Sequence, residues 1–170
     1  MESAQTVERK WAQHLDLPGL PNLYKVSDDL YRGAQPTGEG FRQLDKLGIK
    51  TDVNLRFIHS DKGLIKGTAL DYEHINVTSF WPRTSDVVRF LKIVTDKKRT
   101  PVFVHCHKGI DRAGMMCAAY RVVVQGWSKD DAIEEMTKGG FASRRPYGSV
   151  VNFVRKLDVD RVKQLAGLKE

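Results

Sequence analysis

The stretch from Pro101 to Gly126 constrains the fold more than any other part of the sequence. A short apolar run, "PVFVH", is followed by the glycine-containing segment "CHKGID" and then by the long apolar segment "RAGMMCAAYRVVVQG". The first run has the length and the β-branched content of a buried strand, and the last is long enough for a buried helix. A buried strand that leads through a short loop into a buried helix is typical of a layered α/β protein.

The rest of the chain continues this alternation. Strands are predicted within residues 22–37 (two strands joined by a turn at 27–29), 49–57, 72–77 and 101–105. Helices are predicted over 36–48, 85–99, 112–126 and 128–140, with one or two more over 148–168 and a helical connection over 61–70. We therefore expect an α/β fold with a central, mostly parallel sheet of four to five strands flanked by helices. No repeat or linker divides residues 1–170, so we expect one domain, with residues 1–21 as an N-terminal extension.

Local signals set the ends of these helices. Thr37 and Ser128 can cap the helices that follow them, and either Ser85 or Asp86 can cap the helix near residue 85. Glycines end three helices, at positions 48, 126 and 139.

Charge is distributed unevenly along the chain. The net charge is +7, yet residues 1–85 carry 11 basic and 11 acidic residues, whereas residues 86–170 carry 17 and 10. The excess lies in the half that contains the cysteine loop, and it favours an anionic ligand. No stretch is long and apolar enough for a membrane helix, and the polar start lacks the apolar centre of a signal peptide. We expect a cytoplasmic location, or a mature form from which an export signal has been removed.

The loop after the predicted buried strand has the chemistry of an anion site. Cys106 lies where the strand ends, and the backbone N–H groups of "HKGID" can turn inward above a helix N-terminus. Gly109 allows a backbone conformation that other residues resist, and the planar fork of Arg112 can bind two phosphate oxygens. A cysteine in such a field ionises easily and is placed for attack on phosphorus.

These residues form the pattern HCxxGxxR, which resembles the signature of the cysteine-dependent protein tyrosine phosphatases. The segments "LYRGAQP", "TDVNLR" and "YRVVVQGWSKDDAIEEM" extend the resemblance to the small dual-specificity-type phosphatases over most of residues 22–140. The resemblance implies a phosphatase fold and a phosphoester hydrolase. We expect no metal to be needed, because the loop already supplies positive charge, and we expect no cofactor. The resemblance also implies that Cys106 forms a phosphocysteine, that Arg112 binds phosphate and stabilises the transition state, and that His105 holds the loop and assists thiolate formation.

The chain departs from the family pattern at the general acid. In "NVTSFWPRTSD" the expected acid position falls near Thr78 or Ser79, and Arg83 stands where the larger tyrosine phosphatases have Asp. Two carboxyl groups remain as candidates. Asp111 in "GIDR" resembles the Asp of the myotubularin-type phosphoinositide phosphatases, and Asp86 follows the loop; we rank Asp111 first.

A second departure is Ala113, because the family commonly has Ser or Thr after the arginine. That hydroxyl donates to the sulfur and helps it leave during hydrolysis, which an alanine cannot do.

Basic residues inside the loop favour a multiply phosphorylated substrate. We expect the substrate to contact the loop and helix start at His107, Lys108, Gly109, Ile110, Ala113 and Gly114. Arg144 and Arg145 could hold further phosphates, although a solvated pair is the simpler interpretation. The substrate classes that stay open are a phosphorylated protein, an inositol phosphate, a phosphoinositide headgroup and a phosphorylated nucleotide or RNA end. The last rests on a faint resemblance to RNA 5′-triphosphatases.

Other interpretations of the cysteine loop are compatible with parts of the sequence. A phosphate-binding pseudophosphatase would explain Ala113 and the missing acid, and a rhodanese-type sulfur transferase would also use a cysteine loop. A metal site at His105, Cys106 and His107 is disfavoured because neighbours on a strand point to opposite faces. Cys117 is expected in the core, and Arg32 and Arg56 as structural ion partners. We expect a monomer with no stable nucleic-acid partner.

Overall fold

The computed structural model describes residues 10–141 and 144–168, and within them a six-stranded sheet. The strands are β1 (Gln13–His14), β2 (Tyr24–Ser27), β3 (Leu30–Gly33), β4 (Thr51–Asn54), β5 (Asp71–His74) and β6 (Val102–His105). Their spatial order is β1-β2-β3-β6-β4-β5. The pairs β3–β6, β6–β4 and β4–β5 are parallel, whereas β1–β2 and β2–β3 are antiparallel. The predicted mostly parallel sheet is confirmed, with more strands than the four to five expected, because the two-residue β1 adds an edge.

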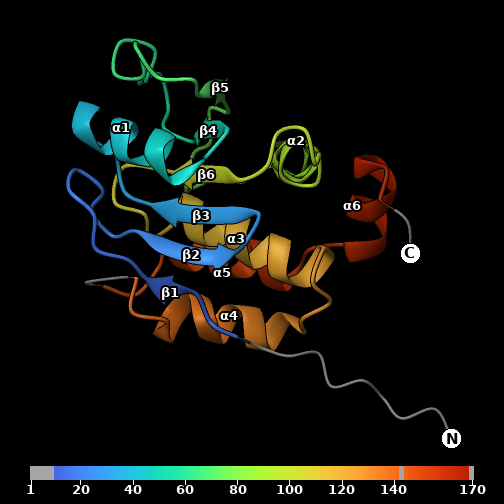
Figure 1. Cartoon of the computed structure of the whole chain (residues 1–170). Coiled ribbons are helices and arrows are strands. Elements are labelled where there is room, and N and C mark those ends of the chain that lie inside the picture. Colours follow the sequence, from blue (N-terminus) through green and yellow to red (C-terminus); the bar gives the residue numbers. More distant parts are fainter. Residues whose placement is uncertain (1–9, 142–143, 169–170) are drawn as a thin grey trace, which may run out of the picture.

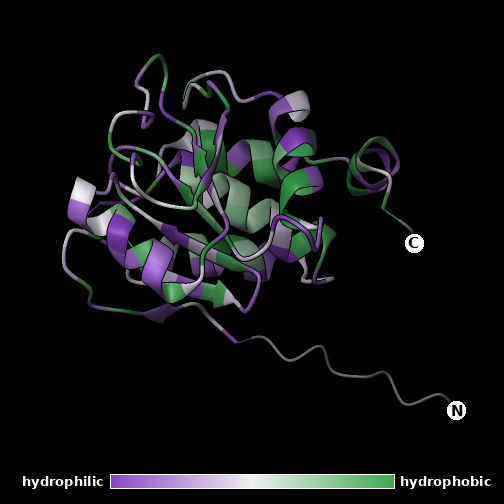
Figure 2. Cartoon of the chain, turned by 45° about the horizontal axis from the view of Figure 1, so that its top comes forward, coloured by the Kyte–Doolittle hydropathy of each residue, from purple (hydrophilic) through white to green (hydrophobic). Residues whose placement is uncertain are grey.

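Helices cover both faces of this sheet. They are α1 (Gly38–Leu47), α2 (Thr84–Val94), α3 (Arg112–Val123), α4 (Lys129–Lys138), α5 (Gly148–Arg155) and α6 (Val159–Ala166). In Figure 1, α1 lies on the opposite side of the sheet from α3, α4 and α5. A small apolar cluster under α1 contains Phe41 and Phe103, while a larger one holds the apolar residues of the other helices. Figure 2 shows hydrophobic residues concentrated in the interior elements and hydrophilic ones on outer turns.

Most helix ends lie where the sequence predicts them. Thr37 Oγ1 accepts from Gly40 N at 3.1 Å, and Gly48 ends α1 in the left-handed region at φ 91°. The prediction for α2 was wrong, because its N-cap is Arg83, without a side-chain cap, and Asp86 lies in the first turn. Residues 61–70, all within the described part of the chain, form turns and no helix, since Gly67 adopts a φ of +83° there.

The N-terminal extension was expected over residues 1–21, and residues 1–9 lie outside the described residues. Residues 10–21 lie against the rest of the protein. Leu15 N donates to Leu23 O at 2.9 Å, Ala12 N donates to Glu135 Oε2 at 2.8 Å, and Leu20 is buried. In the described ranges, no helix combines the length and the apolar character that crossing a bilayer requires.

Strand β6 lies at the centre of the parallel region and determines the position of the cysteine loop. Because side chains alternate along a strand, Val102 and Val104 pack in the larger cluster and Phe103 packs under α1. The carboxyl ends of β3, β6 and β4 meet at one edge of the sheet, which is where ligands bind in open α/β sheets.

Candidate active site

The loop between β6 and α3 places Cys106 at its base. Cys106 is buried, and its Sγ accepts a hydrogen bond from Gly109 N at 3.2 Å. Gly109 adopts a φ of +75°, and a Cβ added there would lie 2.8 Å from the carbonyl carbon of Gly33. Both the backbone conformation and the close approach of β3 therefore require glycine at this position.

The carbonyl groups of the loop point outward. Their hydrogen bonds join His107 O to Gln35 N (3.1 Å), Lys108 O to Asn22 Nδ2 (3.1 Å) and Gly109 O to Arg32 Nη2 (2.9 Å). In a trans peptide the N–H group points away from the carbonyl group of the same unit. The N–H groups of residues 108–110 therefore face the interior of the loop, as an anion nest requires.

A cavity of about 170 Å³ opens above the loop. It is lined by Ser79, Cys106, His107, Lys108, Asp111, Arg112, Arg144 and Tyr147. The Nε atom of Arg112 is buried and has no hydrogen-bond partner among the described residues. The structure thus brings the predicted nucleophile, the predicted phosphate-binding arginine and the side chains of His107 and Lys108 to one cavity.

Other predicted binding residues lie differently. Ile110 lines a neighbouring hollow that shares His107 and Lys108 with the first cavity. Ala113 is fully buried among apolar residues, and Gly114 is buried beside it on α3. Neither lines either hollow.

Both carboxyl groups proposed as general acids are engaged in ion pairs. Asp111 accepts from Arg144 Nη2 at 2.5 Å, from Arg144 Nη1 at 3.3 Å and from Tyr147 N at 2.8 Å. The hydrogen bonds that Arg144 donates to Asp111 raise the pKa of Arg144. Asp86 accepts two bonds of 3.1 Å from Arg83 and does not line the cavity. The structure therefore places Asp111 in the cavity that Cys106 lines and leaves Asp86 outside it.

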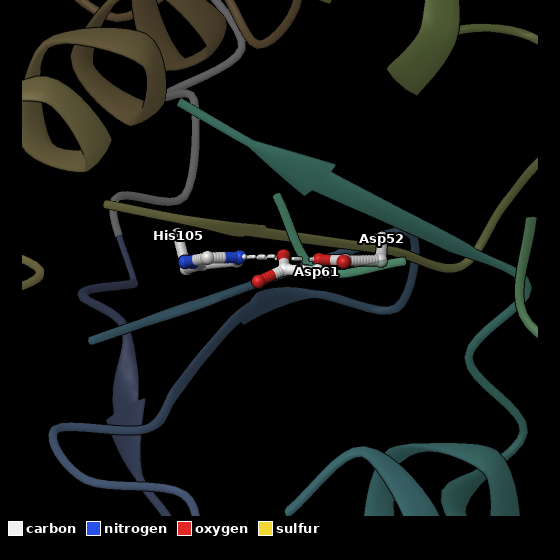
Figure 3. Close-up of side chains that lie close together, drawn as sticks. All are labelled: Asp52, Asp61 and His105. Carbon is white, nitrogen blue, oxygen red and sulfur yellow. Dashed lines mark hydrogen bonds and ion pairs between the residues drawn. The ribbon is translucent and has the colours of Figure 1, made fainter. Parts of the chain in front are cut away.

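His105 is held beneath the loop by carboxyl groups that the sequence analysis did not single out. Its Nδ1 lies 3.1 Å from Cys106 O, and its Nε2 lies 2.6 Å from Asp61 Oδ2 and 3.5 Å from Asp52 Oδ1. Figure 3 shows the three side chains in a row, with Asp61 between His105 and Asp52 in this view. Burial opposes ionisation of Asp61, but the hydrogen bond and charge of His105 lower its pKa to about 2. An aspartate inside the predicted strand segment "TDVNL" was the available signal for Asp52.

The mouth of the cavity is electropositive. Burial lowers the pKa of His107, and the positive charges of Arg56, Lys108 and Arg112 lower it further. Arg32 and Arg56 were expected to be ion partners, but the contacts described for them are to neutral oxygens. Arg32 donates to Gly109 O and stacks on Phe141 at 3.8 Å, while Arg56 donates to Gln35 Oε1 at 3.1 Å. Cys117 is buried in the core as predicted.

Residues 22–147 match the family model described as "DSP-PTPase phosphatase fused to NAD+ Kinase". The chain belongs to this phosphatase family. It is 36% identical over 165 residues to the dual specificity protein phosphatase TpbA of Pseudomonas aeruginosa, an alignment that covers 95% of this chain and 73% of TpbA.

A solved structure of TpbA and a second relative extend this similarity. A crystal structure of a TpbA variant in complex with pTyr superposes with a TM-score of 0.82 at 30% identity, covering 97% of this chain and 99% of the other. Inositol diphosphatase DSP3 of Arabidopsis thaliana is 25% identical over 154 residues, which is 84% of this chain and 73% of DSP3. The predicted dual-specificity-type phosphatase fold is confirmed, and this chain is a phosphatase.

Proposed function

We propose that Cys106 is the nucleophile of this phosphatase and that Arg112 binds the transferred phosphoryl group. The Sγ atom lies at the floor of the inward-facing amides, and Arg112 Nε is buried beside the same cavity. The thiolate attacks phosphorus, the bond to the leaving oxygen breaks, and a phosphocysteine forms. Water then attacks phosphorus, the S–P bond breaks, the thiolate is regenerated and inorganic phosphate is released.

The state of the carboxyl groups near the cavity indicates which leaving group this site can release most easily. An alkoxide needs a proton as it departs, yet Asp111 and Asp86 accept hydrogen bonds from Arg144 and Arg83 in ion pairs. A departing phosphate needs no such proton, because its second ionisation has a pKa of about 6. We therefore propose a multiply phosphorylated substrate that carries a diphosphate group.

Charge around the cavity supports the same class. His107, Lys108, Arg112 and Arg144 all line it, so several cationic or hydrogen-bond-donating groups face a bound polyanion. The relative named inositol diphosphatase DSP3 supports, as the representative substrate, an inositol that carries a diphosphate group.

A second candidate substrate is phosphotyrosine, favoured by an aromatic wall at the cavity rim. Phe80 and Tyr147 stack with ring centroids 5.6 Å apart, and Tyr147 lines the cavity. Phe80 is 63% exposed, so its ring face is available to an aryl phosphate. The TpbA complex with pTyr supports this candidate.

A substrate panel tests both candidates. We expect kcat/KM to fall from a diphosphoinositol to a phosphotyrosine peptide and then to an inositol monophosphate. Phe80→Ala should lower kcat/KM for the peptide alone, and Cys106→Ser should abolish turnover of all three. An inositol monophosphate that is turned over as fast as the diphosphate would refute the leaving-group argument.

The same panel tests the prediction that Asp111 or Asp86 is the general acid. The loss of the true acid should cost about 10²–10⁴-fold on the monophosphate and little on the diphosphate. We expect neither Asp86→Asn nor Asp111→Asn to show that dependence on the leaving group. The monomeric state and the cytoplasmic location stay predictions.

A further inference from the structure

Three titratable side chains form a fully buried cluster behind the cysteine loop. Asp52 lies on β4, Asp61 in the segment that follows β4, and His105 at the end of β6. One ligand atom from each lies within 4.8 Å of those of the other two. In the strand register Asp52 lies opposite Phe103, on the α1 side of the sheet, and Figure 3 shows the three side chains in line.

The hydrogen-bond partners of His105 determine which of its ring nitrogens carry hydrogen. Nδ1 faces the carbonyl oxygen of Cys106 at 3.1 Å, and a carbonyl oxygen only accepts, so Nδ1 carries hydrogen. Nε2 faces Asp61 Oδ2 at 2.6 Å, and Gln35 Nε2 donates to the other oxygen of Asp61 at 2.9 Å. An Asp61 carboxylate that accepts from both sides requires hydrogen on His105 Nε2 as well. Two protonated ring nitrogens make His105 an imidazolium cation.

Asp52 completes the arrangement. Both of its oxygens are buried and have no hydrogen-bond partner among the described residues. A buried, unpaired carboxylate is strongly disfavoured, whereas a protonated carboxyl group gains a donor that can point at Asp61. Burial and the neighbouring Asp61 both raise the pKa of Asp52 well above its ordinary value.

We propose that Asp52 is protonated and donates a hydrogen bond to ionised Asp61, which in turn holds His105 as an imidazolium whose Nδ1–H fixes the Cys106 peptide. The cluster then has no net charge, with one anion, one cation and one neutral acid. Asp52 and Asp61 are positioning residues, because they act on the nucleophile only through His105. The effect of this cluster on catalysis rests on the proposed function, in which Cys106 is the nucleophile. The positions of the protons within the cluster do not depend on that function.

The surroundings keep this arrangement away from solvent. The Tyr72 hydroxyl, from β5, accepts from Asp61 N at 3.1 Å. Rings of Phe103 and Phe41 lie 5.7 Å and 6.3 Å from the His105 ring. Arg56 donates to Gln35 Oε1 at 3.1 Å, and Gln35 donates to Asp61, so this basic side chain is linked to the cluster through one intervening residue.

The distances favour a shared proton over a metal ion. A tetrahedral metal with bonds of about 2.0–2.1 Å holds its ligand atoms roughly 3.3 Å apart. The separation of 2.6 Å between His105 Nε2 and Asp61 Oδ2 is that of a short, charge-assisted hydrogen bond.

The first test uses the unaltered protein. Nitrogen NMR of histidine labelled with ¹⁵N in the ring reports the protonation of His105 directly, with His105→Gln to assign the signals. We expect both ring nitrogens to be protonated at pH 7. One bare ring nitrogen, or a stoichiometric metal ion retained through purification, would overturn the proposal.

The second test measures the consequence for Cys106 by the pH dependence of its alkylation. Cys117 will not interfere, because burial raises its pKa to about 11. In Asp61→Asn the side-chain NH₂ can donate to Nε2, so the contact is kept while the anion and the cation are lost. We expect the alkylation midpoint of Cys106 to rise by about one pH unit or more.

Asp52→Asn is the matched control, because an amide donates to Asp61 as a protonated carboxyl group does. We expect its alkylation midpoint to be unchanged. An equal shift in the two variants, or no shift in Asp61→Asn, contradicts the proposal. NMR and alkylation need no turnover, so they test the proton arrangement independently of the proposed function. Failure of the proposed function would appear in a different experiment, as residual phosphatase activity of Cys106→Ser.

Discussion

Ala113 is expected to make hydrolysis of the phosphocysteine the slow step. The family resemblance places a hydroxyl at this position, where it would donate to the departing sulfur. In the described part of the chain, the hydrogen bond found at Cys106 Sγ is the one from Gly109 N, at 3.2 Å. Ala113 is fully buried on the first turn of α3, and its methyl side chain offers no donor.

The size of the effect follows from the missing bond. A hydrogen bond to a charged group contributes roughly 1.5–3 kcal/mol. Since each 1.36 kcal/mol is tenfold in rate, hydrolysis is slowed by about one to two powers of ten. Transfer to Cys106 is affected less, because the thiolate is its starting state. The phosphoenzyme should therefore accumulate when the leaving group is good.

A stopped-flow trace with a chromogenic aryl phosphate measures this accumulation. We expect a pre-steady-state burst in the unaltered protein, and a smaller burst with a higher kcat in Ala113→Ser. Serine suits this buried site better than threonine because it adds a single heavy atom. Ala119→Ser, on the same helix and equally buried, controls for burying a hydroxyl. A parent protein without a burst, together with an unchanged kcat in Ala113→Ser, would refute the reasoning.

Three other perturbations have defined outcomes. Gly109→Ala should reduce kcat/KM more than tenfold and stability by at least about 1–2 kcal/mol, because of its positive φ and the contact with Gly33; wild-type kinetics would contradict this. Glu135→Ala should cost about 3–5 kcal/mol in urea unfolding, since buried Arg121 loses its partner at 2.8 Å, and adding Arg121→Met should recover part of it. The raised pKa of Asp52 means that its stabilising contribution, present below its unfolded pKa of about 3.9, is lost as pH rises toward the folded value. Asp52→Asn should therefore gain stability relative to the parent as pH rises from 4 to 8, and a pH-independent difference would be the contrary result.

The strand, loop and helix around Cys106 could be predicted because all their determinants are contiguous. The apolar run, the required glycine and the arginine lie within a few residues of one another, so local rules place the thiol at a helix N-terminus. Helix caps such as Thr37 and Ser128 were predictable for the same reason.

Contacts made by the topology could not be predicted in this way. Asp61 is 44 residues from His105 in sequence, and Arg144 is 33 residues from Asp111. The strand order that brings them together is not encoded in any local pattern. Asp86 is a residue for which a local pattern gave the wrong role. Its position at the start of an apolar helix indicated a helix cap or a general acid, but in the structure it pairs with Arg83 outside the cavity.

The most direct test of the account is to trap the covalent intermediate. The protein is mixed with a ³²P-labelled aryl phosphate, quenched within the burst, digested and mapped by mass spectrometry. We predict labelled phosphate on the peptide that contains Cys106, bound through an S–P bond that mild acid hydrolyses, and none in Cys106→Ser. Turnover with label on another residue, or with no labelled protein in the burst phase, would contradict a phosphocysteine mechanism at Cys106.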